Sequence, residues 1–394
     1  MLSFFQRNTE DVLIRPLTID DWDELETMIA TDPIKNLYAS EHLERFGLPT
    51  PSTLSGQRQN YGFMGIFIPV YENAPIVHHG VELAYGNFET ERKNTNTRKP
   101  YLPDSERMSQ TVKKVTEKLF DKITLKPRRP IPLQNEILEP HEKYSQEHSA
   151  TFFTMVGAFW LGSNCVPIVI PKEYRKHAST MITRSIKYIS SIIGDAEDVL
   201  GLWELLQPKA ATPLSVSEDQ PLLYLDPQKS LETFTTQKIQ PQQKNLDVPA
   251  IKENAVRWAR TSDRHSLLKA SVAMFIEEVG YDPMTRDSAG YIQRVEEYIR
   301  TGRTLVATND DGVVIFKADL GLAYSDLCQI QGVWLHPAYR GVGLSAPLLA
   351  QAIELIRPRF PHISLYVNSH NQRAYRLYQS LGMEQHGTFA TVTF

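Results

Sequence analysis

Cysteine is scarce in this sequence of 394 residues, and no run of apolar residues is long. Cys165 and Cys328 are its two cysteines, and neither belongs to a CxxC pair. Two isolated cysteines supply neither a disulfide framework nor a zinc site, so we expect a reducing compartment and no bound metal. No stretch approaches the roughly 18 apolar residues that a membrane helix needs, and the first residues lack the apolar core of a signal peptide. We therefore expect a cytoplasmic protein without membrane contact.

A surplus of positive charge is also missing. Lys and Arg total 42 against 46 Asp and Glu, which gives a formal net charge of −4. A nucleic-acid-binding domain usually presents a basic field, so we expect no nucleic-acid partner. The fractions of apolar residues (41%) and charged residues (22%) are ordinary for a globular protein. A chain of this length predicts two or three domains.

Two segments far apart in the sequence begin in the same way, with a short strand followed by a helix. Residues 12–29 combine an apolar run with helical spacing, for which Asp20 is the expected cap, and residues 255–275 repeat this order. Each helix is followed by an Asp-Pro pair, Asp32-Pro33 in one case and Asp282-Pro283 in the other. The repeat predicts a duplicated fold. Two unrelated strand–helix units would produce the same weak pattern.

The segment between residues 87 and 146 is polar and has little apolar periodicity. We interpret it as an insertion within the first domain. Its basic run at 126–132 could touch an anionic partner, although a solvated loop explains the run more simply. A polar, Gln-rich connector follows later. We predict an N-terminal domain over residues 1–227, a linker over 228–247 and a C-terminal domain over 248–394.

Strand and helix patterns alternate in the C-terminal domain. After the opening unit we expect a helix at 288–300, strands at 304–308, 312–318 and 328–335, a helix at 344–356, a strand at 362–367, a helix at 372–381 and a strand at 388–394. In the N-terminal domain the expected elements after the insertion are strands at 152–161, 166–170 and 190–194, helices at 174–188 and 196–206, and a strand at 222–225. This order predicts an α/β (α+β) fold with a mixed sheet.

A glycine-containing loop follows the strand that ends with Val333-Trp334-Leu335. Pro337 stops that strand, and Arg340-Gly341-Val342-Gly343-Leu344-Ser345 leads into a helix. Glycines let the backbone approach a ligand closely, and the free N–H groups at a helix start favour a phosphate or pyrophosphate. Arg340 adds a planar cationic donor. An ordinary turn with two glycines would explain the same residues.

A second motif lies downstream, after a strand that leads to Asn368. It reads Asn371-Gln372-Arg373-Ala374-Tyr375-Arg376-Leu377-Tyr378-Gln379-Ser380-Leu381-Gly382-Met383. Together the motifs resemble those of the GNAT superfamily of acetyl-CoA-dependent N-acetyltransferases. The loop falls on that family's Q/R-x-x-G-x-G/A pattern, with Ser345 replacing the last small residue. The downstream motif falls on N-x-x-A-x-x-L-Y-x-x-x-G-F.

The whole chain resembles an actinobacterial tandem type, in which a degenerate N-terminal GNAT-like domain precedes an intact C-terminal GNAT domain. The resemblance implies two tandem GNAT-like domains, each with a mixed, mostly antiparallel central sheet flanked by helices. Residues 171–177, where the first copy should have its loop, contain no glycine. We therefore expect only the second copy to bind acetyl-CoA.

The resemblance implies a direct attack of a primary amine on acetyl-CoA in a ternary complex. Tyr378 would protonate the departing thiolate as a general acid, and Glu277 or Glu278 would accept the amine's proton. His336, His386 and the terminal carboxylate of Phe394 are alternative bases, the last because similar tandem acetyltransferases of the enhanced-intracellular-survival type use one. The residues expected to bind acetyl-CoA are Val333, Trp334, Leu335, Arg340, Gly341, Val342, Gly343, Leu344, Ser345, Asn368 and Asn371.

The acceptor is left open between a small-molecule amine and a protein amine. A homodimer is left open as well. An alternative from another class is a non-catalytic acyl-CoA-binding sensor or scaffold protein, which the degenerate first copy would allow. A different acyl donor is a third option, because the loop would bind the phosphates of CoA rather than its acyl group.

Overall fold

The protein is described here by a computed structural model, in which the described residues are 12–51, 61–70, 77–78, 81–82, 152–235 and 255–394. The expected insertion and most of the expected linker lie outside them. The chain divides into two compact units, one of residues 68–154 and one of residues 1–67 with 155–394. The described part of the smaller unit includes an antiparallel pair of short strands, β3 (Val77–His78) and β4 (Val81–Glu82). Residues 68–70 and 152–154 of the smaller unit are the ends of two strands that continue into the larger unit, β2 (Gly62–Val70) and β5 (Phe152–Leu161).

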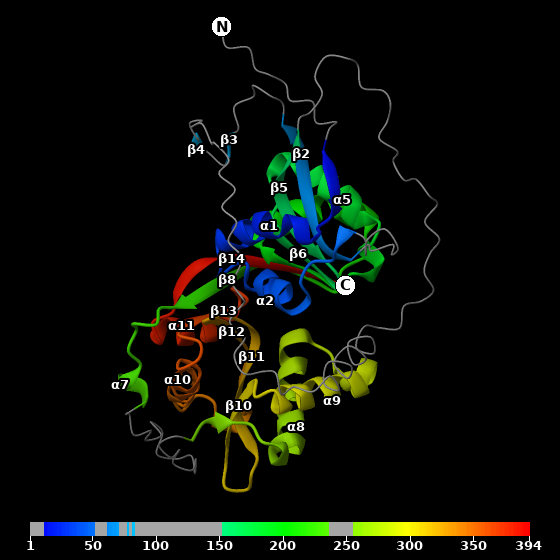
Figure 1. Ribbon diagram of the computed structural model, residues 1–394. Helices are drawn as coiled ribbons and strands as arrows, with labels where there is room; N and C mark the ends of the chain where they lie inside the picture. The colour runs from blue at the N-terminus through cyan, green and yellow to red at the C-terminus, as the bar shows by residue number, and fades with distance from the viewer. Residues whose placement is uncertain (1–11, 52–60, 71–76, 79–80, 83–151, 236–254) are drawn as a thin grey trace, which may run out of the picture. The chain divides into compact units, whose positions relative to one another are not determined.

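One continuous sheet of twelve strands organises the larger unit (Figure 1). In order across the sheet the strands are β1 (Leu13–Pro16), β2 (Gly62–Val70), β5 (Phe152–Leu161), β6 (Asn164–Val169), β7 (Ser191–Asp195), β14 (Glu384–Thr393), β8 (Ser215–Leu225), β13 (His362–Tyr366), β12 (Leu327–Leu335), β11 (Val314–Tyr324), β10 (Thr304–Thr308) and β9 (Arg257–Trp258). Parallel pairing joins β6 to β7 and β12 to β13, whereas the other strand pairs with a described register are antiparallel. The prediction of a mixed, mostly antiparallel sheet flanked by helices is confirmed.

Strands β8 and β14 exchange places at the centre of this sheet. β8 belongs to the predicted N-terminal domain, residues 1–227, yet it pairs with β13, where Leu223 lies opposite Leu365. β14 comes late in the sequence, yet it pairs with β7, where Thr391 lies opposite Ile193. The two strands also pair with each other, and Figure 1 shows β14 in red beside β8 in green. The strand order is therefore symmetric about this central pair, and each half of the chain completes the other half's edge.

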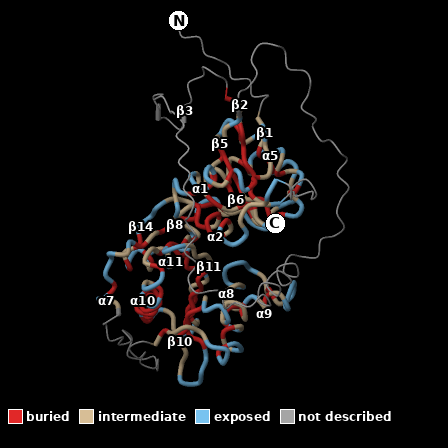
Figure 2. Tube along the Cα trace, in the orientation of Figure 1, coloured by how far each residue is buried: buried red, intermediate tan, exposed pale blue. Residues whose placement is uncertain are grey.

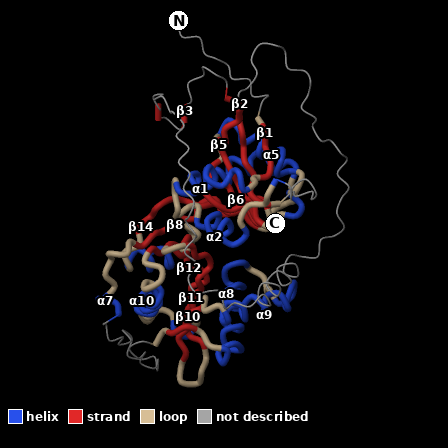
Figure 3. Tube along the Cα trace, in the orientation of Figure 1, coloured by secondary structure: helices blue, strands red, loops and turns tan. Residues whose placement is uncertain are grey.

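Helices cover both faces of the strands from β10 to β12. The helices of the unit are α1 (Trp22–Ala30), α2 (Leu37–Phe46), α5 (Arg175–Thr183), α6 (Ala196–Leu206), α7 (Glu232–Thr235), α8 (Arg264–Val279), α9 (Met284–Arg300), α10 (Ser345–Ile356) and α11 (Gln372–Ser380). Helices α8 and α9 lie on one side of these strands and α10 on the other (Figures 1 and 3). Helix α10 is apolar and largely buried, as Figure 2 shows in red. No helix in the described residues is both long and apolar enough to cross a membrane.

Several elements have bounds other than those predicted: β11 and β14 are longer, and α5 ends earlier, at Thr183. Helix α9 begins at Met284, but Asp287 inside it has the non-helical angles φ −148° and ψ 75°, so a kink separates the first turn from the regular helix. The Asp287 side chain accepts the Gly290 N–H at 2.9 Å and caps that regular part, which starts where the sequence predicts a helix, at Ser288. Strand β8 begins at Ser215, whereas the sequence predicts a strand over residues 222–225 alone. Its pairing with β14 extends the strand, and a distant partner of this kind leaves no local sequence pattern.

The two halves open with the same side-chain arrangement. In the first, Arg15 binds both carboxylate oxygens of Asp21 at 2.7 Å. In the second, Arg257 binds those of Asp263 at 2.6 and 2.8 Å, again six residues later. Each aspartate also accepts a backbone N–H three residues earlier and so caps the turn that begins the helix. The expected cap Asp20 is thus replaced by Asp21, and the repeat supports a duplicated fold.

Candidate functional site

The candidate site is built where strands β12 and β13 diverge. These parallel strands pair at three positions, the last of which joins Gln329 to Ser364. β12 then continues to Leu335 and β13 to Tyr366 without further pairs, both strands being described in full. The main-chain groups of β12 that face this opening are therefore available to an extended ligand, because backbone groups that lack a ladder partner must be satisfied in another way.

The loop after β12 presents its backbone at one end of the opening. Gly341 and Gly343 have φ angles of 80° and 84°, and a Cβ atom built on either would meet no described atom within 4 Å. Between and after them, Val342 and Leu344 are buried and anchor the loop. Helix α10 begins at Ser345, so its first N–H groups point toward the same place. Open backbone beside a helix N-terminus fits a diphosphate.

Arg340 does not extend freely from this loop. Its Nη2 lies 2.8 Å from Oε2 of Glu277 on α8, and its Nε donates to the Leu335 carbonyl at 2.8 Å. The Trp334 indole N–H donates to the same Glu277 carboxylate at 3.3 Å. Arg340, the expected phosphate-binding residue, and Glu277, an expected base, thus form one ion pair. The Glu277 carboxylate accepts hydrogen bonds from both Arg340 and Trp334.

Tyr378 lies on α11 among the apolar residues that pack around α10, and it is 7% exposed. Burial and, to a smaller extent, the negative charge of Glu278 raise its pKa. Among the described residues none hydrogen-bonds to the Tyr378 hydroxyl. A buried phenol with a raised pKa keeps its proton at neutral pH, as a general acid must before it reacts.

Glu278 lies beside Glu277 at the end of α8, but its surroundings differ. Desolvation raises the pKa of its carboxyl group, Glu277 and Asp319 add to the rise, and Lys317 opposes it. Glu278 nevertheless keeps exposed surface, so solvent limits this rise. A carboxylate with a moderately raised pKa, close enough to influence the pKa of Tyr378, is suited to accept a proton from an amine.

The two predicted asparagines are held by the protein. The side-chain oxygen of Asn368 accepts a hydrogen bond from Gln220 of β8 at 2.9 Å, and Gln220 in turn accepts one from Thr391 of β14 at 2.7 Å. The exchanged strands therefore reach the edge of the site. Asn371 caps α11, because its side chain accepts the Ala374 N–H at 3.1 Å. Gln220 was not expected, since it lies in the segment whose strand pattern is weak.

Each alternative base has a partner of its own, and His336 lies in the loop that directly follows β12. His386 contacts Asp32 at 2.9 Å, at the end of α1. The Phe394 ring meets Trp203 of α6 edge to face, with ring centroids 5.7 Å apart. His336 accepts the Ala338 N–H through Nδ1 at 3.2 Å and so begins the short turn Pro337–Tyr339. Of the expected bases, Glu278 is the one for which electrostatic coupling to Tyr378 is found.

A polar group inside the sheet was missed at the sequence level. Lys317 of β11 is 1% exposed, and its ammonium contacts Asp319 Oδ2 at 2.6 Å and the Gly332 carbonyl at 3.1 Å. The sequence did contain a signal for this group. Lys317 and Asp319 are two residues apart in strand β11, so their side chains lie on the same face of the sheet. A lysine and an aspartate with this spacing, between apolar neighbours, predict a buried ion pair.

The turn of the first half that corresponds to the glycine loop is closed. Arg175, which begins α5, donates to Asp198 at 2.9 Å and its side chain is 13% exposed. The guanidinium of this turn is thus already paired with a carboxylate of α6, and the turn contains no glycine. No group of three or more His, Cys, Asp or Glu residues in the described part of the chain is arranged to hold a metal ion.

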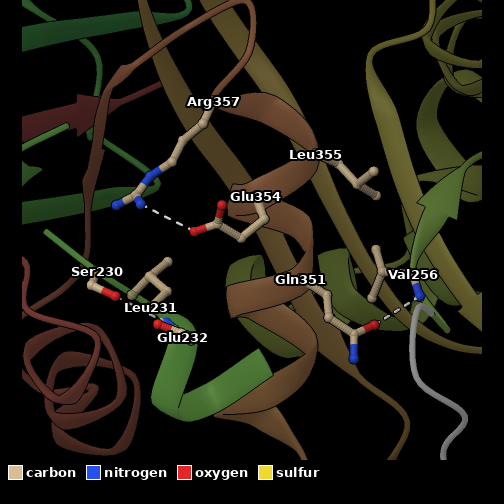
Figure 4. A pocket seen from close by; sticks show the side chains of 8 residues that line it. All are labelled: Ser230, Leu231, Glu232, Val256, Gln351, Glu354, Leu355 and Arg357. Atoms are coloured by element: carbon tan, nitrogen blue, oxygen red, sulfur yellow. Dashed lines mark hydrogen bonds and ion pairs between the residues drawn. The ribbon is translucent and has the colours of Figure 1, made fainter. Parts of the chain in front are cut away.

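A separate cavity of about 550 Å³ lies against the last two turns of α10 (Figure 4). It is lined by Ser230, Leu231, Glu232, Val256, Gln351, Glu354, Leu355 and Arg357. None of these is a predicted site residue, and the cavity lies at the opposite end of α10 from Ser345. In Figure 4 Gln351 reaches the Val256 N–H and Arg357 reaches Glu354. These contacts join α10 to its neighbours, and the cavity is not the candidate site.

Two different family models match two different parts of the chain. Residues 272–383 match the model of the acetyltransferase (GNAT) family. Residues 150–247 match a model described as a domain of unknown function (DUF4081). The comparison with curated proteins finds no match.

Solved structures with a similar fold include several acetyltransferases. One from the GNAT family of Colwellia psychrerythraea is 11% identical with a TM-score of 0.38, covering 61% of this chain and 82% of its own. A GCN5-related N-acetyltransferase from Kribbella flavida is 17% identical with a TM-score of 0.38, covering 60% and 85%. A tandem GNAT protein from the clavulanic acid biosynthesis pathway is 13% identical with a TM-score of 0.37, covering 61% and 79%.

Proposed function

Since residues 272–383 of this chain belong to the GNAT acetyltransferase family, we propose that the protein is an acetyl-CoA-dependent N-acetyltransferase. It transfers the acetyl group to a primary amine of a small molecule or a protein by direct attack in a ternary complex. One observation carries the proposal: β12 and β13 diverge beyond Gln329 and Ser364, and the open glycine loop follows β12. Tyr378 is buried in the same apolar cluster as Leu335 and Val342, which lie before and within that loop. Such an opening accommodates a long, narrow acyl donor.

Both main-chain and side-chain groups bind acetyl-CoA in this proposal. The backbone from Gly341 to Ser345, with Arg340 released from Glu277, holds the diphosphate of CoA. The exposed edge of β12, from Val333 to Leu335, pairs with the amide groups of the pantetheine arm. Asn368 and Asn371 line that arm from the other side of the opening. This arrangement places the thioester near the end of the opening where Tyr378 and Glu278 act.

Two residues move protons in the proposed reaction. Glu278 accepts a proton from the protonated amine, so that the neutral nitrogen can attack the thioester carbon. A carbon–nitrogen bond forms, the carbon–sulfur bond breaks, and the electron pair of that bond leaves with the sulfur. The nitrogen releases its second proton to solvent as the amide forms. Tyr378 donates its proton to the thiolate and regains one from solvent. The raised pKa of Glu278 favours proton uptake, and the raised pKa of Tyr378 keeps its hydroxyl protonated until the thiolate forms.

A non-catalytic acyl-CoA sensor is the alternative, and a Tyr378→Phe variant separates it from the enzyme. Purified wild type and variant are incubated with acetyl-CoA and a panel of primary amines, and released CoA is measured alongside acetyl-CoA affinity by calorimetry. We expect unchanged affinity and a loss of turnover of roughly 10²- to 10⁴-fold. Tyr375→Phe on the same helix is the matched control, because its hydroxyl contacts Gln385 at 3.4 Å.

Two outcomes would contradict the proposal. Undiminished turnover in Tyr378→Phe would remove the acid from the mechanism. A wild type that binds acetyl-CoA but acetylates no amine of the panel would favour the sensor. Propionyl-CoA and longer acyl-CoA donors in the same assay test whether acetyl is the transferred group.

A further inference from the structure

The strongest observation that the mechanism above does not use is the buried ammonium of Lys317. The side chain lies under α8 and is 1% exposed, and a charge removed from water in this way requires partners. Its Nζ contacts Asp319 Oδ2 at 2.6 Å, the Gly332 carbonyl at 3.1 Å and the Met274 sulfur at 3.5 Å. Asp319 is itself fixed by Thr304, whose hydroxyl donates to Oδ1 at 2.8 Å. The ion pair is thus held in one position.

The carbonyl that Lys317 binds belongs to a β-bulge in β12. Lys317 lies opposite Trp334 and Asp319 opposite Gln331, so the single residue Ala318 faces two residues of β12. The first of them, Gly332, has a φ of 58° in the left-handed region. A Cβ at Gly332 would lie 3.0 Å from both the Lys317 ammonium and an Asp319 oxygen. Both the φ angle and the lack of space therefore favour glycine at this position. The bulge interrupts the ladder beside the opening between β12 and β13.

The orientation of the bulged peptide follows from its geometry. No described peptide bond is cis, and in a trans peptide the C=O and the N–H point in opposite directions. Because the Gly332 carbonyl points to Lys317, the Val333 N–H points away from Lys317. Val333 packs against the same apolar cluster that contains Tyr378, whereas Trp334 belongs to the cluster under α8 and α9. The peptide therefore has its carbonyl toward α8 and its N–H toward the Tyr378 side.

We infer that Lys317 is a positioning residue that fixes and polarises the Gly332–Val333 peptide, so that the Val333 N–H stabilises the negative charge developing on the thioester oxygen. The inference rests on the proposed acetyl transfer. An ammonium on the carbonyl end of a peptide draws electron density from it and strengthens the N–H as a donor. A donor fixed in place before the reaction contributes more to catalysis than one that must reorient.

The test measures the thioester carbonyl directly and requires no acceptor. Acetyl-CoA labelled with ¹³C at the acetyl carbonyl is bound to the protein, and its stretching frequency is read by isotope-edited infrared spectroscopy. In wild type we expect the frequency to fall on binding, because a strong donor polarises the carbonyl. In Lys317→Met we expect most of this fall to disappear while the affinity for acetyl-CoA stays unchanged. Lys35→Met, which removes a lysine paired with Asp195 at 2.7 Å in the first half, should leave the frequency as in wild type.

A second variant answers the objection that Lys317→Met leaves Asp319 as an unpaired buried charge. The double variant Lys317→Met with Asp319→Asn removes both charges and keeps an oxygen acceptor for Thr304, and such neutral replacements of buried ion pairs are well tolerated. In wild type, the Val333 amide proton should also shift downfield when acetyl-CoA binds, as seen with selective ¹⁵N-valine labelling.

The outcomes separate this inference from the proposed function. A full frequency shift in both Lys317 variants, or an unmoved Val333 amide, would overturn the role of Lys317 and leave acetyl transfer intact. A wild type that does not bind acetyl-CoA would overturn the proposed function and this inference with it.

Discussion

Arg340 and Glu277 are joined across 63 residues of sequence, with the Arg340 Nη2 at 3.0 and 2.8 Å from the two carboxylate oxygens of Glu277. The pair connects the loop before α10 to the end of α8. An anionic ligand at the loop must therefore compete with Glu277 for the guanidinium. Glu277 is in this way a competitor for the ligand site, whereas its neighbour Glu278 retains its carboxylate for proton transfer.

We predict that Glu277→Gln strengthens acetyl-CoA binding. Both side chains of the pair are partly exposed, 30% for Arg340 and 42% for Glu277. Such pairs contribute about 0.2–1 kcal/mol, so calorimetry should show a dissociation constant lower by up to roughly 5-fold. Glu296→Gln, which removes an exposed partner of Arg264, is the control and should bind as wild type does. Weaker binding in Glu277→Gln would mean that the pair assists the ligand.

The pH profile should identify Glu278 as the base. Because its pKa is raised, the carboxyl keeps its proton to a higher pH than an ordinary glutamate, and only the deprotonated form can accept a proton. We expect kcat/KM to rise with pH through that raised pKa. Glu278→Gln should remove this limb and lower kcat by about 10²-fold, while Glu277→Gln should keep it. If kcat/KM of Glu278→Gln rises with pH as that of wild type does, another group is the general base.

Stability in acid should depend on Asp263. The hydrogen bonds from Arg257 hold its pKa below the usual 3.8. A carboxyl group with a pKa lowered by folding stabilises the protein above its unfolded-state pKa, and this stabilisation is lost as the pH falls through the folded-state pKa. Asp263→Asn should lower the free energy of unfolding by about 1–3 kcal/mol at pH 7.

The difference between Asp263→Asn and wild type should shrink below pH 4 in denaturant titrations, because wild type then loses the same interaction. The exposed Asp310, in the turn between β10 and β11, provides the control, and Asp310→Asn should match wild type at every pH. A difference that is constant with pH would show that the charge of Asp263 is not what stabilises the turn.

Leu223→Ala should weaken both halves of the larger unit at once. Leu223 is fully buried in β8, opposite Leu365 of β13 and Gln385 of β14. Removing a buried leucine side chain costs about 2–5 kcal/mol. We expect calorimetry to show a single unfolding transition at a lower temperature. The exposed Val216 lies in the same strand, and Val216→Ala should change little. Two separated transitions in Leu223→Ala would show that the halves unfold independently.

Much of this fold was predictable because its signals are local. Helix α6 and strand β5 have the bounds expected from apolar periodicity. The loop with Gly341 and Gly343 was predictable for the same reason, since its residues adjoin in sequence. The exchange of β8 and β14 was not predictable, because pairing with an antiparallel strand about 170 residues away does not show in the local pattern of apolar residues. The Arg340–Glu277 pair and the contact between Lys317 and Gly332 depend on the same long-range proximity.

The exchange of β8 and β14 also bears on how the chain could have diverged. A symmetric order of this kind is what fusing two identical subunits with swapped final strands would yield. After such a fusion the first copy is free to lose its glycines and its ligand, but it cannot lose β8 without uncovering β13 of the second. Selection would then preserve the first copy as a scaffold for its partner's edge, whatever became of its own ligand site.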